Sequence, residues 1–270
     1  FARGCDIERG PKTVCGNRTL AAMRDRDGLA PLFFAEHILV ILNRLRPTCY
    51  RRVLRTDAAA SGQCGRPPAL PRHVEHHADI APIATGQQVV GPAVTLRYIP
   101  ERNSVTQSFL DKAKAKLADR DAYAVAEPGD VVVIDAGGQG TVSCCGDLSA
   151  TAAVARGIAG NIIDGGCRDV GHIRRIGLPV WSRGITPRTG KYRLEAAEIN
   201  GPVTIAGVQV RPGDLIVADD SGIVVIPMER AAEVLQKVRE TIEKEDKVVD
   251  AVRRGATVAE LQRILDPSKW

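Results

Sequence analysis

Three charged residues between positions 135 and 169 have the types and spacing of a site for a small anion. Asp147 lies at the expected start of a helix, and Arg168-Asp169 follow after the twenty residues 148–167. Mg²⁺ keeps much of its hydration in proteins and takes one or two carboxylates, which Asp residues can supply. An Arg beside them can hold a carboxylate or enolate oxygen in a bidentate fork. These residues therefore indicate a site for an anionic substrate and a divalent cation.

The same residues also have a purely structural interpretation. Asp is a common helix-capping residue, so Asp147 could serve only to cap its helix. Arg168 and Asp169 could form only an ion pair with each other. The residue pattern alone does not separate this interpretation from the binding site.

A strand–helix–strand unit is expected to bring the three residues together. The β-branched run 131–134 and the run 161–164 predict two buried strands, and 147–158 predicts an Ala-rich helix between them. Strands joined in this way are parallel, so the loops that follow them leave the sheet at one edge. Open α/β sheets bind their ligands at this edge. Asp147 and the Arg168-Asp169 pair are therefore expected to converge.

Glycine-rich segments surround these residues. Residues 135–140 and 164–169 are expected to be loops whose glycines at 137, 138, 165 and 166 let the backbone approach a ligand closely. Backbone N–H groups at the start of the Asp147 helix would add donors for an anion. The first segment does not have the G-x-G-x-x-G pattern and no Walker A lysine follows it, so nucleotide binding has no support.

Strands and helices alternate over the rest of the chain. A Pro-Gly-Asp turn precedes an apolar strand twice, at 128–130 and at 212–214, which indicates a repeated turn–strand device. Thr257 and Glu260 have the spacing of a capping box for a last short helix. The other predicted strands are 89–98, 178–181, 203–210, 215–218 and 222–226, and the other predicted helices are 29–46, 104–117 and 229–254.

Composition limits the class of protein. The chain has 270 residues, of which 44% are hydrophobic and 26% charged, as in ordinary globular proteins. Its longest apolar stretch, 29–42, is interrupted by Pro31 and Glu36, so we expect no membrane span. The first 80 residues hold 13 Lys/Arg and 8 Asp/Glu. Such a stretch could contact phosphates, but the scattered charges and the 4% aromatic content argue against a nucleic-acid partner. Seven Cys without a C-x-x-C pair indicate a reducing, cytoplasmic location.

Several separated motifs resemble one known family. The segments 146–153 and 164–169 look like the signature of the RraA-like family, an Asp followed after twenty residues by Arg-Asp. Flanking segments at 90–95, 177–180 and 210–227 are similar as well. The resemblance covers about residues 80–265, so residues 1–79 are interpreted as a basic N-terminal extension of uncertain structure and 80–270 as the catalytic domain. The family often has Gly four residues before the first Asp, where this chain has Ser143.

The resemblance implies a fold, an activity and a set of site residues. The fold would be α/β, a layered swivelling β/β/α domain with βαβ units. The activity would be that of a metal-dependent, class II type aldolase that cleaves 4-hydroxy-4-methyl-2-oxoglutarate (HMG) to pyruvate, with oxaloacetate decarboxylation as a side activity. Asp169 would hold Mg²⁺ or Mn²⁺, Arg168 would bind substrate and steady the enolate, and Asp147 would orient a water. Gly146 and Asp147 would also bind the substrate, and the Leu148 N–H would contact the substrate carboxylate.

The family also implies an assembly and a second type of function. Its sites lie between subunits of a homotrimer, or of a hexamer made from two trimers, and take a Glu from a neighbour. Glu245 is our candidate, because it falls on the apolar stripe of the helix expected at 229–254; a Glu at the stripe edge that reaches water is the alternative. Other family members are non-catalytic inhibitors of the endoribonuclease RNase E, which is the alternative function. An RNA-associated protein that uses the basic first 80 residues is a third hypothesis.

Overall fold

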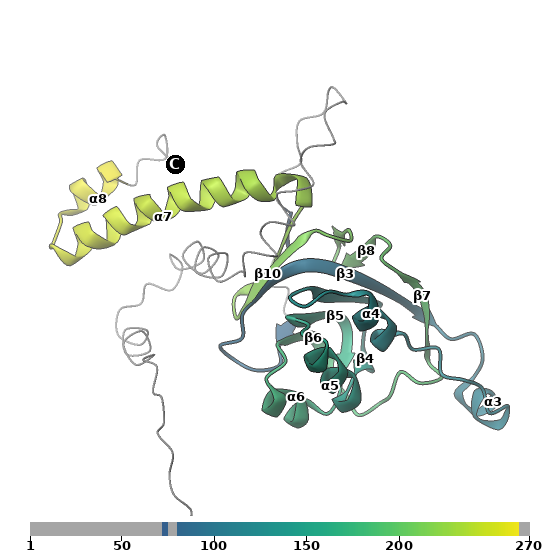
Figure 1. Ribbon diagram of the computed structural model, residues 1–270. Helices are drawn as coiled ribbons and strands as arrows, with labels where there is room; N and C mark the ends of the chain where they lie inside the picture. Colours follow the sequence, from purple (N-terminus) through teal and green to yellow (C-terminus); the bar gives the residue numbers. More distant parts are fainter. Residues whose placement is uncertain (1–71, 75–79, 265–270) are drawn as a thin grey trace, which may run out of the picture. The chain divides into compact units, whose positions relative to one another are not determined.

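The computed structural model describes residues 72–74 and 80–264 (Figure 1). Most of the predicted extension 1–79, including the helix expected at 29–46, lies outside the described residues. The segment that is described there, β1 (Arg72–Val74), pairs antiparallel with β11 (Gly222–Ile226). The boundary between residues 79 and 80 stays a prediction.

Four long strands form the parallel centre of the main sheet. They are β3 (Val89–Pro100), β4 (Val131–Cys145), β5 (Gly160–Cys167) and β6 (Val180–Ile185). Each pairs in parallel with the next, so the predicted βαβ unit is confirmed. Shorter antiparallel strands extend the sheet on both sides: β1 and β11, together with β2 (Ala81–Pro82), β7 (Leu194–Ile199) and β10 (Leu215–Asp219). The strand order is β1-β11-β10-β3-β4-β5-β6-β2, with β7 also paired to β3. A separate hairpin is made by β8 (Val203–Ile205) and β9 (Val208–Val210).

Alternating side chains of the parallel strands build a hydrophobic core on each face. Val132 and Ile134 of β4 belong to the core that includes helix residues. Val131 and Val133 belong to the opposite core, which includes Val203 of the β8–β9 hairpin and apolar residues of β10 and β11. Because both faces of β4 are covered, the sequence of its first four residues is apolar throughout. The result is the β/β/α layering expected for the fold.

The helices lie in two parts of the chain. Figure 1 shows α4 (Asp119–Val125), α5 (Asp147–Ala155) and α6 (Val170–Ile176) close to the parallel strands. The short helix α3 (Val105–Leu110) comes between β3 and α4 along the chain. After β11 follow the 3₁₀ turn η3 (Met228–Arg230), the long α7 (Ala231–Arg253) and α8 (Val258–Ile264). None of the helices within 80–264 is both long enough and apolar enough to cross a membrane.

Two local sequence signals are confirmed in detail. Thr257 N donates to Glu260 Oε2 at 2.7 Å and Glu260 N donates to Thr257 Oγ1 at 3.4 Å, which is the predicted capping box before α8. In the two Pro-Gly-Asp turns the Asp carboxylate accepts from the backbone three residues earlier. Glu127 N donates to Asp130 Oδ2 and Arg211 N donates to Asp214 Oδ2, both at 2.9 Å.

Other predictions of secondary structure were wrong or incomplete. The helix expected at 104–117 ends at Leu110, and Lys112 has a positive φ of 50°. The strand expected at 203–210 is a hairpin, because Ala206 and Gly207 form its turn with positive φ values. Helices α4 and α6 and strand β7 had no predicted counterpart, since each is short and lacks a clear period.

The glycine-rich segments were also predicted incorrectly as loops. Both continue their strands: β4 runs to Cys145 and β5 to Cys167. From Asp135 to Cys145 β4 advances ten positions while its partner β5 advances three, from Asp164 to Cys167, so β4 bulges strongly. Gly137 and Gly138, with φ of 63° and 75°, supply the left-handed backbone in this bulge.

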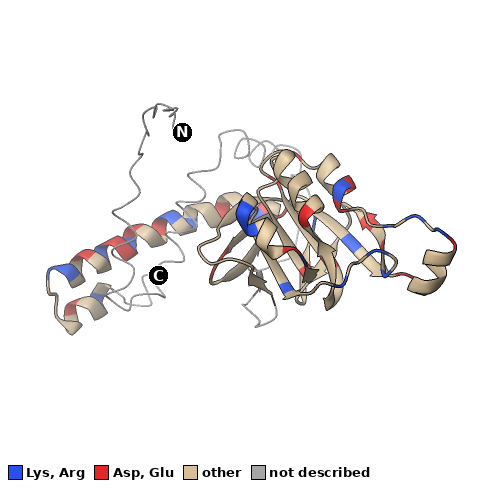
Figure 2. Ribbon diagram, turned by 90° about the horizontal axis from the view of Figure 1, so that it is seen from below, with Lys and Arg blue, Asp and Glu red and all other residues tan. Residues whose placement is uncertain are grey.

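Charged residues of both signs alternate along α7, as Figure 2 shows. Ion pairs such as Lys237–Glu233 at 3.2 Å link successive turns of its surface. The predicted apolar stripe is present on the other side of the helix. Its buried residues are Ala231, Leu235, Ile242, Val248 and Ala251.

Candidate functional site

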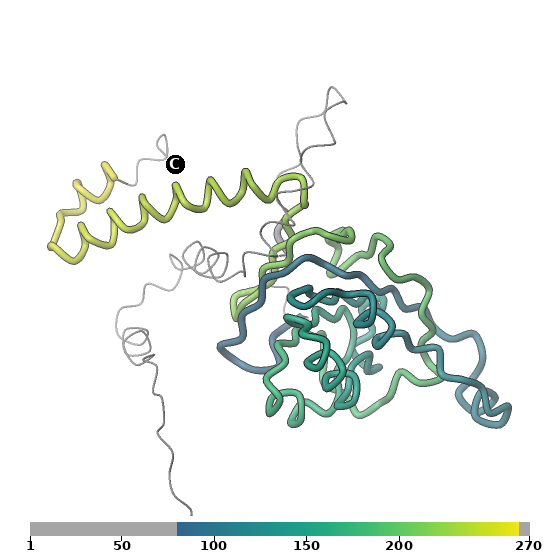
Figure 3. Tube along the Cα trace, viewed as in Figure 1, coloured from purple at the N-terminus to yellow at the C-terminus, as the bar shows by residue number. Residues whose placement is uncertain are grey.

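Helices α5 and α6 begin at the same edge of the sheet, where β4 and β5 end. The chain passes from β4 through Gly146 into α5, and from β5 through Arg168 and Asp169 into α6, as the tube in Figure 3 lets the reader follow. Because β4 and β5 are parallel neighbours, both helix starts lie side by side. The structure therefore brings Asp147, Arg168 and Asp169 together as the sequence predicts.

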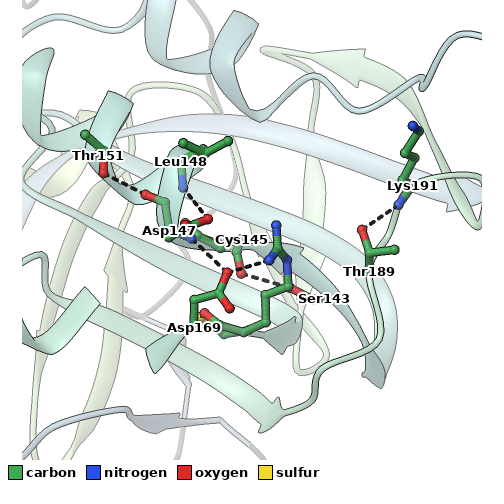
Figure 4. A network of polar contacts seen from close by, with 11 residues as sticks. Ser143, Cys145, Asp147, Leu148, Thr151, Asp169, Thr189 and Lys191 are labelled. Carbon is green, nitrogen blue, oxygen red and sulfur yellow. Dashed lines mark hydrogen bonds and ion pairs between the residues drawn. The ribbon is translucent and has the colours of Figure 1, made fainter. Parts of the chain in front are cut away.

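The carboxylate of Asp169 is the centre of this group (Figure 4). Its Oδ2 accepts from Arg168 Nη1 at 2.5 Å and from the backbone N–H of Asp147 at 3.2 Å. The side chains of Arg168 and Asp169 are each 35% exposed, so solvent and small molecules can reach them. The ion pair of the structural interpretation is thus present, and both of its side chains are partly exposed to solvent.

Asp169 has an unusual backbone conformation. Its φ of 56° and ψ of 32° lie in the left-handed region, which residues other than Gly seldom adopt. Its carbonyl oxygen accepts from His172 N at 2.9 Å and from Ile173 N at 3.2 Å, so the first turn of α6 holds the residue in place. Strained backbone of this kind is concentrated at functional sites. No feature of the sequence predicted it.

The absence of a side chain at Gly146 leaves room for the Arg168 guanidinium. A Cβ atom at Gly146 would lie 2.7 Å from Cζ and 2.8 Å from Nε of Arg168, closer than van der Waals contact allows. The backbone N–H of Arg168 also donates to the Cys145 carbonyl at 2.9 Å. Gly146 is therefore required for the position of Arg168, in addition to any contact with substrate.

Asp147 is the first residue of α5, and Gly146 is the N-cap. The Asp147 carboxylate accepts from Leu148 N at 2.8 Å, so in this structure the N–H predicted to meet a substrate carboxylate is bonded to Asp147 Oδ1. The Leu148 side chain is 73% exposed. The Asp147 carboxylate thus bonds within the first turn of α5 without capping the helix, while the Asp147 backbone N–H donates to Asp169.

Ser143 was noted only as a departure from the family pattern, but it has a defined structural role. The side chain is buried, and its Oγ donates to the Cys145 carbonyl at 2.8 Å. Its backbone N–H donates to the Arg188 carbonyl at 2.8 Å, which ties the end of β4 to the segment that follows β6. Ser143 therefore braces the strand end that leads to Gly146 and Asp147.

Gly165 and Gly166 serve packing, which corrects the prediction that they open the backbone to a ligand. A Cβ at Gly166 would lie 2.6 Å from the Val142 carbonyl oxygen, and one at Gly165 would lie 2.8 Å from the Ala136 Cβ. Both residues are buried. Their lack of a side chain lets the bulged end of β4 lie against β5.

Two further carboxylates at the strand ends are structural. Asp164 pairs with Arg183 and its Oδ2 accepts from Ala206 N at 2.9 Å. Asp135 Oδ2 accepts from Thr204 N at 3.2 Å. Both residues thereby anchor the β8–β9 hairpin to the sheet.

Buried thiols lie directly behind the site. Cys145 and Cys167 are neighbours across β4 and β5. A hydrogen bond from the Cys167 thiol lowers the pKa of Cys145, and the same bond together with burial raises the pKa of Cys167. Burial raises the pKa of Cys144 to about 12. Cys144 and Cys167 are therefore protonated packing residues at neutral pH.

Glu245 lies in α7 and takes no part in the contacts that join β4, β5, α5 and α6 around Asp169. Its side chain is partly buried on the apolar side of the helix. The prediction that it completes the site of a neighbouring subunit is not tested by a single chain.

A separate cavity of about 280 Å³ lies beside the braced strand end. Its lining includes Gln139 and Val142 of β4 and Arg188, Tyr192 and Arg193 of the segment after β6. Asp147, Arg168 and Asp169 are not among its lining residues. Because the Arg168 and Asp169 side chains are each 35% exposed, the charged group around Asp169 lies at the surface of this chain.

The donor set around Asp169 fits a magnesium-type ion. No cluster of three or more His, Cys, Asp or Glu side chains suited to a metal occurs within 72–74 and 80–264. That part of the chain therefore lacks a zinc site built from protein ligands alone. Mg²⁺ needs only one or two carboxylates when water and substrate fill its other positions, and Asp169 with Asp147 beside it meets this requirement.

The fold and the site define a class of layered α/β protein with an Arg-Asp pair and a helix start at the ends of parallel strands. The RraA-like family (Aldolase/RraA) matches residues 69–225, and the chain belongs to this family.

Individual relatives agree with this assignment. A Halalkalibacterium halodurans protein named "Putative 4-hydroxy-4-methyl-2-oxoglutarate aldolase" is 35% identical over 191 residues, 70% of this chain and 84% of that protein. Protein DlpA of Legionella pneumophila is 33% identical over 184 residues, but the match spans 66% of this chain and only 28% of that protein. The solved structure of Streptomyces coelicolor RraAS2, described as an unusual member of the RNase ES inhibitor RraA protein family, has 32% identity and a TM-score of 0.54. The similarity covers 63% of this chain and 80% of the RraAS2 chain.

Proposed function

We propose that this protein is a divalent-metal-dependent lyase that cleaves a 4-hydroxy-2-oxo acid of the HMG type to pyruvate, with oxaloacetate decarboxylation as a side activity. The observation that carries the proposal is the position of Asp169, held between the Arg168 guanidinium and the Asp147 N–H at the start of two helices. The names of relatives such as the H. halodurans protein support the same reaction class.

Asp169 would hold Mg²⁺ or Mn²⁺ mostly through water, with Asp147 alongside. When bound, the ion would supply Lewis-acid polarisation of the substrate keto group. Arg168 would pair with the oxygen on which negative charge develops as the bond between C3 and C4 breaks. As the bond between C3 and C4 breaks, the C4 hydroxyl would give its proton to water and C4 would become the carbonyl carbon of the second product. Asp147 would orient the water that delivers a proton to C3 of the pyruvate enolate. The N–H groups at the start of α5 would hold the substrate carboxylate once Asp147 releases Leu148 N.

The experiment measures pyruvate release from HMG and from oxaloacetate by the full chain with Mg²⁺, with a chelator and with Asp169→Asn. We expect turnover that the chelator abolishes. Asp169→Asn should lower kcat/KM by at least about 100-fold, since even outer partners of metal ligands typically cost 10- to 100-fold. Asp121→Asn, an exposed change on α4, is the matched control. A folded, metal-loaded protein without turnover would contradict the proposal.

The similarity to RraAS2 favours a second candidate, a protein inhibitor of an endoribonuclease. Such a role needs no Arg-Asp site, so Asp169→Asn should inhibit the nuclease as well as the unchanged protein does. Inhibition together with the absence of lyase activity would favour this candidate.

A further inference from the structure

Helices α5 and α6 are joined twice, once at the candidate site and once a helical turn further on. The first link is the hydrogen bond from Asp147 N to Asp169 Oδ2. The second joins Thr151 Oγ1 of α5 to His172 Nε2 of α6 at 3.1 Å. Thr151 lies four residues after Asp147 and His172 three after Asp169, spacings that place each pair on one side of its helix. The second link therefore extends the first along the same contact between the helices.

The hydrogen bonds fix the direction of the second link. The Thr151 hydroxyl donates to the Asp147 carbonyl at 2.8 Å and has a single hydrogen to give. Its oxygen must then accept from His172, so His172 Nε2 carries a hydrogen. His172 thus bonds to a hydroxyl that itself contacts the backbone of a candidate site residue.

We propose that His172 is a positioning residue for the site: through Thr151 it holds the first turn of α5, and with it Asp147, at a fixed place relative to Asp169. A Thr that bonds to the carbonyl four residues earlier is common in helices and by itself ties nothing to a second element. The imidazole turns this local bond into a link between the two helices that carry the site.

The effect on turnover follows from geometry. The substrate would be held by the start of α5 on one side and by Arg168 and Asp169 on the other, so a shift between the helices would spoil both contacts. Misplacement of reacting groups costs rate steeply. We expect loss of the link to lower kcat/KM about fivefold to tenfold, in line with one hydrogen bond of ordinary strength.

The experiment compares His172→Leu and Thr151→Val, which remove the link, with His172→Gln, whose amide N–H can replace that of Nε2. Arg175→Gln, an exposed change on α6, is the control. The two link-removing variants should lose activity to the same extent, and the double variant should be no worse than either, since both changes remove one bond. His172→Gln should regain most of the loss at an unchanged melting temperature. Additive losses, or a Gln variant as poor as the Leu variant, would overturn the proposal.

This inference rests on the proposed function for its kinetic readout, so a second measurement stands apart from catalysis. The backbone amide NMR signals of Asp147 and Leu148 should shift in His172→Leu and return in His172→Gln. If the unchanged protein shows no turnover but these signals behave as expected, the lyase is wrong and the positioning role holds. Signals that stay unmoved in His172→Leu contradict the positioning role whatever the activity.

Discussion

Single atoms decide the geometry around Arg168. The guanidinium occupies the space that a Cβ at Gly146 would fill, at 2.7 to 2.9 Å. Because Arg168 is a flexible side chain, its head can move aside when a methyl group is added there. The fold should survive such a change while the Arg168 to Asp169 contact is lost.

Gly146→Ala is therefore expected to raise the KM for the 2-oxo acid about tenfold, as the loss of a charge-assisted contact would. The melting temperature should change little, and steady-state kinetics with thermal unfolding would check both. Gly171→Ala, where a Cβ meets nothing within 4 Å, is the matched control. Equal KM values for the two variants would show that Gly146 does not position Arg168.

Asp147 and Asp169 show how one residue type takes different roles. The Asp147 carboxylate accepts from the N–H of the next residue at the start of α5, where Gly146 is the N-cap. Asp169 adopts a left-handed conformation and accepts from the neighbouring Arg168 side chain and from the Asp147 N–H, which the fold brings close. The residue spacing predicted that they meet, but their individual conformations depend on contacts from β4 and α6.

At the scale of elements, the paired ends of β4 and β5 depend on glycine for contact. Gly166→Ala would place a methyl group 2.6 and 2.7 Å from the carbonyl oxygens of Val142 and Gly140, which are backbone atoms and cannot rotate away. We expect it to lower the free energy of unfolding by roughly 1–3 kcal/mol, as overpacking does.

Gly171→Ala in α6 should instead raise stability by about 0.5–1 kcal/mol, because Ala is the better helix former. Urea denaturation of both variants would measure the contrast. A Gly166→Ala protein as stable as the unchanged chain would refute the packing role.

The second Pro-Gly-Asp turn makes stability depend on pH. Burial raises the pKa of Asp214 above its ordinary value of 3.8, although hydrogen bonds from Arg211 N and Met228 N oppose the shift. Because the pKa of Asp214 is higher in the folded state than in the unfolded state, the folded state binds the proton more tightly. The contribution of Asp214 to the free energy of unfolding is therefore greatest at low pH and is lost as the pH rises.

The stability of the unchanged protein relative to Asp214→Asn should therefore fall as the pH is raised from about 4 to 7. Denaturation curves at several pH values would test this, with the exposed Asp246→Asn as control. A difference that grows with pH would mean that the hydrogen bonds outweigh burial.

At the scale of the whole molecule, the prediction is that a second subunit contributes Glu245 to the proposed site. The Asp169 group is open to solvent in one chain, and Glu245 belongs to a helix outside that group. If Glu245 acts on a neighbour's site, Asp169→Asn and Glu245→Gln should each be inactive alone. When the two variants are unfolded and refolded together, roughly a quarter of the sites should be restored. A restored site needs Asp169 from a Glu245→Gln chain and Glu245 from a neighbouring Asp169→Asn chain, and each choice has a chance of about one half.

Size-exclusion chromatography would check that the mixed protein assembles as the unchanged protein does. Failure to regain pyruvate release in a mixed assembly would place Glu245 outside the site or within the same chain as Asp169.

The sequence by itself determined the features that depend on neighbours along the chain. Periodicity and residue type predicted the first four residues of β4, the starts of α5 and α8 and the two Pro-Gly-Asp turns, since caps and turns are satisfied locally. The crossover rule for parallel strands also predicted that Asp147 and the Arg168-Asp169 pair converge.

Only the tertiary structure decided what distant segments do to one another. Ten residues of β4 lie opposite three of β5, which turned the expected loops into bulged strand and made Gly165 and Gly166 packing residues. The brace at Ser143 and the link from His172 to Thr151 follow from contacts between separate elements. Such contacts depend on the three-dimensional register of strands and helices, which no local pattern of residues specifies.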